Sequence, residues 1–124
     1  MAAPFELETH DRIVLVRTVG DLDLETADLL RDGCLAAVTN DCIGLVVDLS
    51  GSDYLDSAGI RALFAIGERL RPHRQRLALV VPPEAHMRRV LDIVDIETSA
   101  SLDETTEAAF RRLRLPAHGG APGA

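Results

Sequence analysis

The fold is decided by Leu45-Val46-Val47-Asp48-Leu49-Ser50-Gly51, followed two residues later by Tyr54-Leu55-Asp56-Ser57-Ala58-Gly59-Ile60. Residues 43–49 form an almost unbroken apolar run, which is typical of a central strand covered on both faces. Residues 50–53 read as a loop. Residues 57–70 then place apolar side chains on one helical stripe, and Asp56 or Ser57 is suited to cap the start of this helix. The stretch therefore predicts a buried strand, a loop and a helix in succession.

The rest of the chain continues this alternation on both sides. We expect strands at residues 5–10, 13–19, 43–49 and 77–81, with a last short strand at 95–98. We expect helices at 24–38, 57–70, 83–93 and from a capping box in 101–104 to residue 115. The order ββαβαβαβα predicts a single α/β domain, with a mixed β-sheet packed by about four helices.

The predicted domain covers residues 5–115. Residues 1–4 are expected to be an N-terminal arm, and residues 116–124, mostly Gly, Ala and Pro, a disordered tail. The start of the chain has neither the basic segment nor the apolar segment of a secretory signal, and no apolar run approaches the length of a membrane span. These features predict a cytoplasmic protein.

Composition narrows the classes of function. The net charge is −7, so the chain has no general attraction for nucleic acid or anionic membranes. Cys34 and Cys42 have neither CxxC spacing nor a nearby histidine pair, so we expect buried free thiols and no metal site. We expect no cofactor either, because GxxxxGK[ST] and GxGxxG motifs are both absent.

Ser57 is the strongest candidate for a functional residue in the sequence. Taken alone, an Asp-Ser pair at a helix start is explained by capping. Three neighbouring features favour a role for this segment in contacting another protein, in addition to capping the helix. Ala58 and Gly59 are small enough to let another protein approach the backbone, and Gly59 costs helix propensity with no local benefit visible in the sequence. Tyr54 and Leu55 precede the cap and are expected to offer an apolar patch.

A catalytic role for Ser57 is disfavoured. The GxSxG nucleophile elbow is absent, and the four histidines show no triad pattern (His10, His73, His86 and His118). We therefore expect a binding module and not an enzyme.

Two segments, taken together, resemble the STAS domain family, specifically the stand-alone anti-sigma-factor antagonists of bacteria. Residues 20–27, Gly-Asp-Leu-Asp-Leu-Glu-Thr-Ala, resemble that family's G-[ED]-[LI]-D-x-x-[TS]-[AVS] segment. Residues 45–51 with 54–60 resemble its strand, loop and D-S-[SAT]-G helix start. Ala58 replaces a frequent second serine, which leaves Ser57 the only hydroxyl at that place. Asp95 lies where a glycine is often seen after the third helix.

The resemblance implies a partner switch. The unphosphorylated chain would bind a serine-kinase anti-sigma factor and free a sigma factor. The kinase would phosphorylate Ser57, and a PP2C-type phosphatase would reset the switch. The resemblance also implies the partner-binding surface, which consists of Asp21, Asp23, Tyr54, Leu55, Asp56, Ser57, Ala58 and Gly59.

The sequence leaves two points open. One alternative is a scaffold or ligand-sensing STAS subunit of a larger assembly that works without phosphorylation. The other is the oligomeric state, for which we expect a monomer or a weak dimer.

Overall fold

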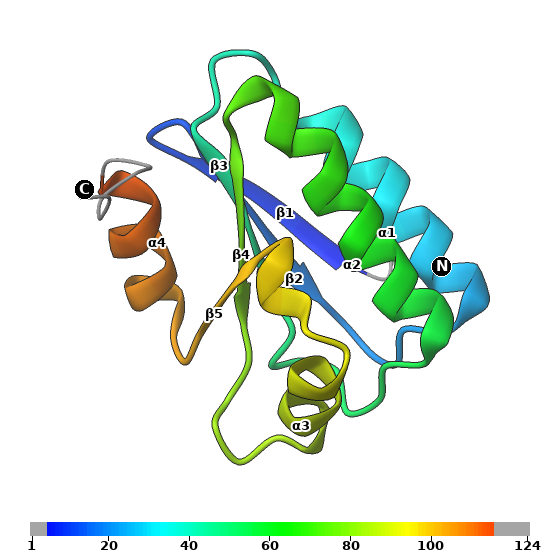
Figure 1. Cartoon of the computed structure of the whole chain (residues 1–124). Coiled ribbons are helices and arrows are strands. Elements are labelled where there is room, and N and C mark those ends of the chain that lie inside the picture. Colours follow the sequence, from blue (N-terminus) through cyan, green and yellow to red (C-terminus); the bar gives the residue numbers. More distant parts are fainter. Residues whose placement is uncertain (1–4, 116–124) are drawn as a thin grey trace.

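The computed structural model describes residues 5–115, and all of its strands belong to one five-stranded sheet (Figure 1). The strands follow the chain order across the sheet: β1 (Phe5–His10), β2 (Ile13–Thr18), β3 (Gly44–Asp48), β4 (Arg76–Val80) and β5 (Ser101–Asp103). β1 runs antiparallel to β2, and every other pair of neighbours is parallel. The predicted mixed sheet is confirmed. The predicted arm and tail lie outside the described residues.

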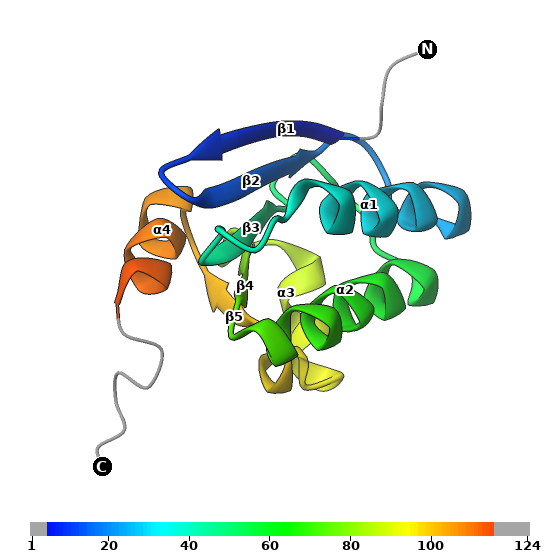
Figure 2. The same cartoon turned by 90° about the horizontal axis from the view of Figure 1, so that it is seen from above.

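Helices cover both faces of the sheet (Figure 2). α1 (Leu24–Ala37) and α2 (Ser57–Leu70) lie side by side on one face, and α4 (Thr106–Arg114) lies on the opposite face. α3 (His86–Ile93) contributes Met87 and Leu91 to the same core as α1 and α2. Two short 3-10 turns complete the chain, η1 (Arg71–His73) and η2 (Ile96–Thr98). The predicted order ββαβαβαβα, with four helices, is confirmed.

The burial of β3 on both faces explains why its sequence is almost continuously apolar. All five of its residues are buried, because helices cover the sheet on both sides of this central strand. Alternate residues serve the two cores. Leu45 and Val47 face the larger core with α1 and α2, while Val46 faces the smaller core under α4.

The cysteines are as expected. Cys34 and Cys42 are free and buried. Burial raises the pKa of the Cys34 thiol to about 12, so the thiol is protonated at neutral pH.

The last strand is placed differently from the prediction. Residues 95–98 were expected to be extended, but Asp95 has a left-handed φ of 59° and residues 96–98 form η2. Ile96 is fully buried in that turn, so its apolar character reflects packing of the turn and not a strand. The strand is Ser101–Asp103, which pairs in parallel with Ala78 to Val80 of β4.

Two helix starts are corrected as well. The last helix does not open at a capping box in residues 101–104. It begins at Thr106, and the Thr105 side chain accepts a hydrogen bond from the Ala108 N–H. The third helix begins at His86 and not at Pro83. The Ala85 N–H closes a turn onto the Pro82 carbonyl, and Ala85 itself is extended.

Candidate functional site

Two loops leave the same edge of the sheet and run side by side. β2 and β3 are parallel neighbours, so the loops after them, residues 19–23 and 49–56, emerge together. Three backbone hydrogen bonds join them, from Gly20 N to Gly51 O (3.1 Å), from Leu22 N to Tyr54 O (3.0 Å) and from Asp56 N to Leu22 O (3.3 Å). The two sequence segments singled out for function therefore form one surface.

A buried polar cluster anchors the second loop. The Thr18 and Ser52 hydroxyls lie 2.7 Å apart, and both residues are buried. The Ser50 N–H donates to the Asp48 carboxylate at 2.9 Å. A Cβ on Gly51 would collide with the Thr18 carbonyl oxygen, so glycine allows the loop to pass closely over the end of β2. These contacts fix the path by which β3 reaches α2.

Asp56, and not Ser57, is the N-cap of α2. Its carboxylate accepts a hydrogen bond from the Gly59 N–H at 3.0 Å. Ser57 is the first residue of the helix and is exposed. Within residues 5–115 the Ser57 hydroxyl makes no hydrogen bond. The hydroxyl is thus accessible and is not needed to hold the helix start.

Asp23 caps the neighbouring helix α1. Its carboxylate accepts from the Thr26 N–H at 3.1 Å, and the Thr26 hydroxyl takes part in a reciprocal capping box. These hydrogen bonds from Thr26, the backbone one first, lower the pKa of Asp23. Asp21 precedes it and is exposed. Asp23 therefore caps α1 and Asp21 adds an exposed carboxylate, and both lie on the loop that adjoins the Ser57 loop.

Leu55 and Gly59 lie inside the domain. Leu55 is 7% exposed, so the expectation that it adds to a surface patch is wrong. Gly59 is buried too, and a Cβ there would collide with the Leu55 side chain and come within 3.1 Å of the Leu22 carbonyl oxygen. Its cost in helix propensity therefore has a local structural reason. Both residues shape the surface from below.

Exposed apolar side chains do surround the site, but from other positions. Tyr54 is 55% exposed as expected, and it is joined by Leu24 at 66% and Val19 at 51%. Leu24 belongs to the helix expected over residues 24–38, and its apolar character alone would suggest a place in the core. At 100° per residue, however, Leu24 points roughly a quarter turn away from Ala27, Leu30 and Cys34, which are buried. This angular offset along the helix is the feature of the sequence from which the exposure of Leu24 could have been predicted.

A groove between α1 and α2 begins beside Ser57. Its volume is about 640 Å³. Leu24 and Ala58 line its end near the site, and Phe64 and Ala65 continue it along α2. Charged residues stand on both sides, namely Asp28, Arg31, Arg61 and Glu68. Ala58 therefore contributes to a mostly apolar recess next to the serine.

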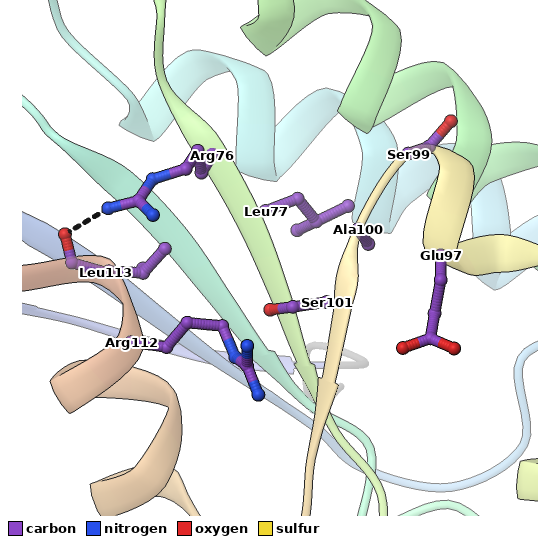
Figure 3. Close-up of a pocket in the computed structure, with 8 residues that line it drawn as sticks. All are labelled: Arg76, Leu77, Glu97, Ser99, Ala100, Ser101, Arg112 and Leu113. Carbon is purple, nitrogen blue, oxygen red and sulfur yellow. Dashed lines mark hydrogen bonds between the residues drawn. The ribbon is translucent and has the colours of Figure 1, made fainter. Parts of the chain in front are cut away.

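A second recess, of about 360 Å³, lies away from Ser57 between β4, β5 and α4 (Figure 3). The two arginines that line it, Arg76 and Arg112, both form hydrogen bonds that hold the fold together. The Arg76 guanidinium donates to the Leu113 and Leu115 carbonyls at 2.6 and 2.7 Å, at the end of α4. Arg112 donates to the buried Asp103 carboxylate at 2.9 Å. These contacts account for the two guanidinium groups that line this recess.

The described residues contain no group of three or more potential metal ligands. Among them, no helix has the length and apolar character that crossing a membrane requires.

Comparisons with known proteins agree with this architecture. The family model described as the STAS domain matches residues 4–113. The anti-sigma-F factor antagonist RsfB of Mycobacterium tuberculosis H37Rv is 31% identical over 61 residues, which are 49% of this chain. That match spans about half the length of the relative, 50%.

Solved structures give the same result. The crystal structure of an anti-sigma factor antagonist from Mycobacterium paratuberculosis superposes with a TM-score of 0.78 and 28% identity, covering 89% of this chain and 92% of the other. The anti-sigma factor antagonist SpoIIAA in its unphosphorylated form gives a TM-score of 0.69 at 24% identity, with coverage of 89% and 97%. The latter likeness shows the shared fold. Since the family model spans nearly all of the described residues and the fold agrees, the chain belongs to the STAS domain family.

Proposed function

We propose that this chain is an anti-sigma-factor antagonist whose unphosphorylated form binds a serine-kinase anti-sigma factor and thereby frees a sigma factor. The observation that carries the proposal is the Ser57 hydroxyl. It is exposed and free of hydrogen bonds within residues 5–115, and it stands at the start of α2, directly after the 49–56 loop that is bonded to the 19–23 loop. The names of the relatives support the same function, because RsfB and the Mycobacterium paratuberculosis protein are both anti-sigma factor antagonists.

The surface around Ser57 suits a protein partner. Tyr54, Leu24 and Val19 expose apolar area, and Ala58 opens onto the groove between α1 and α2. Asp21, Asp23 and Asp56 supply carboxylates at the same edge. We assign these residues to the partner-binding surface, with Leu55 and Gly59 supporting it from the interior.

Phosphorylation of Ser57 would switch this surface off. The hydroxyl oxygen would form a bond to the γ-phosphorus of ATP and lose its proton, while the bond to ADP breaks. The product carries nearly two negative charges at the contact surface. Such a group collides with acidic or apolar partner groups. A loss of only about 3 kcal/mol weakens binding more than a hundredfold. A PP2C-type phosphatase would restore the hydroxyl by hydrolysis, with release of inorganic phosphate.

We propose that the chain acts as a monomer or a weak dimer. It needs no catalytic activity of its own in this scheme. The kinase supplies the chemistry and holds the nucleotide. Ser57 accepts the phosphoryl group and the surrounding loops are recognised.

The direct test is phosphorylation in vitro with a candidate serine-kinase anti-sigma factor and ATP. We expect one phosphate on the wild-type chain and none on Ser57→Ala, measured by intact-protein mass spectrometry. Ser50→Ala is the matched control, since Ser50 is an exposed serine in the same loop and its loss should change nothing. Stoichiometric phosphorylation of Ser57→Ala would show that the site is elsewhere.

A second class of function makes opposite predictions. A phosphorylation-independent scaffold or ligand-sensing subunit would form a stable larger assembly and carry no phosphate on Ser57 in cells. Size-exclusion chromatography with light scattering, combined with phosphopeptide mapping from cells, separates the two.

A further inference from the structure

Ser57 and Arg61 lie on the same face of α2. They are four residues apart in a helix that runs unbroken from Ser57 to Leu70, and both are exposed. At this spacing the Cβ atoms of two helical residues are about 5–6 Å apart, within reach of a long side chain. A guanidinium carries five N–H donors in a planar fork that matches the oxygens of a phosphate.

Within the described part of the chain, the Arg61 guanidinium is not engaged by another side chain or carbonyl. It takes part in none of the ion pairs or hydrogen bonds formed among residues 5–115. The arginine across the groove is different, because Arg31 lies 3.4 Å from the Asp28 carboxylate and 3.2 Å from that of Asp32. Of the two arginines that line this groove, Arg61 is therefore the one that is available for a new anion.

The charged residues of the two joined loops and of the first turn of α1 are all acidic. Asp53 and Asp56 precede Ser57 on its own loop, and Asp21, Asp23 and Glu25 lie on the adjoining loop and the first turn of α1. Neither loop contains a basic residue, and Arg61 is the sole charged side chain among residues 57–64. A phosphate at Ser57 would thus lie next to the carboxylates of the two loops, with the Arg61 guanidinium as the cation on its own helix.

We propose that Arg61 is the built-in counterion of phosphoserine 57, forming an ion pair within α2 once the phosphate is attached. The pair neutralises part of the new charge inside the chain and holds the phosphate along the helix, toward the groove. It rests on the proposed phosphorylation of Ser57. It also adds to the switch, because phosphorylation withdraws a free guanidinium from the surface at the same time as it adds an anion.

The test is a ³¹P NMR pH titration of the full chain carrying phosphoserine at position 57, introduced during translation. A nearby cation lowers the second pKa of a phosphate, so Arg61→Gln should raise it. For an ion pair at this spacing, with charge-assisted hydrogen bonds, we expect a rise of roughly 0.3 to 0.7. Gln keeps a long side chain and a similar helix propensity, which protects the fold.

Arg69→Gln is the matched control. Arg69 is an exposed arginine on the same helix, and twelve residues place it roughly 18 Å from Ser57 along the axis. This exceeds the screening length of about 10 Å at 0.1 M salt, so Arg69→Gln should leave the phosphate pKa at its wild-type value. A rise in Arg61→Gln alone supports the ion pair.

Equal phosphate pKa values in the wild type and Arg61→Gln would overturn the proposal, and so would an equal rise in both variants. The result does not depend on a kinase, since the phosphate is installed during synthesis. Failure of the kinase to modify Ser57 would refute the proposed switch while leaving the titration unaffected. The two ideas can therefore fail separately.

Discussion

Gly59 is buried in the first turn of α2, with the Leu55 side chain and the Leu22 carbonyl against it. These two neighbours belong to the bridge that joins the loops after β2 and β3. A Cβ at this position would force the Leu55 side chain to shift and would press against the Leu22 carbonyl oxygen. The close packing around position 59 therefore favours a residue without a side chain.

Gly59→Ala should therefore destabilise the protein by about 1–2 kcal/mol, as overpacking typically does. Helix propensity alone predicts the opposite, a gain of up to about 1 kcal/mol. Urea denaturation followed by circular dichroism decides between the two. A more stable Gly59→Ala protein would contradict the close packing described here.

Asp23 provides a pH test at the same scale. Its pKa is lowered from the ordinary value of 3.8 by hydrogen bonds from Thr26, so the folded state favours the ionised carboxylate. The resulting stabilisation is present above pH 3.8 and is lost as the pH falls through the folded-state pKa. Asp23→Asn keeps a capping side chain but does not titrate. Its free energy of unfolding should fall less between pH 6 and pH 2 than that of the wild type. An equal fall in both proteins would rule out the contribution of Asp23.

At the scale of the elements, α4 is tied to β5 by one ion pair. The Asp103 side chain is 4% exposed and accepts from Arg112 at 2.9 Å. Arg112 itself is about half exposed, which weakens the pair through solvent screening. The loss of Arg112 would still leave a buried carboxylate with only the Ser101 hydroxyl as its side-chain partner among residues 5–115.

We expect Arg112→Ala to lower the free energy of unfolding by about 1–2 kcal/mol. Arg111→Ala is the control, because Arg111 is an exposed neighbour that forms no ion pair among the described residues. Thermal denaturation of both variants checks this. Similar midpoints for the two would show that the ion pair does not hold α4 in place.

Residues 95–105, which include β5, are the part of the fold that the sequence pattern did not predict correctly. Long elements with clear periodicity, such as α2 and β3, were predicted close to their bounds. Residues 95–105 hold a 3-10 turn, a three-residue strand and a cap in quick succession. Such short segments carry too few apolar positions to define a period. Ile96 and Leu102 are both buried, yet only pairing with β4 makes Leu102 part of a strand.

At the scale of the whole molecule, the site depends on the order of the strands. β2 and β3 are parallel neighbours, and this brings residues 19–23 against residues 49–56. The pairing of the two segments followed from the family resemblance and not from local pattern. Burial of Leu55 and exposure of Leu24 needed three-dimensional packing, although the helical angle of Leu24 gave a hint.

We propose that a single phosphate on Ser57 decides whether this surface binds its partner. The most direct measurement is isothermal titration calorimetry of a serine-kinase anti-sigma factor that binds the unmodified chain, repeated with the chain carrying phosphoserine 57. The proposed switch predicts that the phosphate raises Kd at least a hundredfold, equivalent to about 3 kcal/mol. Equal affinity for both forms would contradict it.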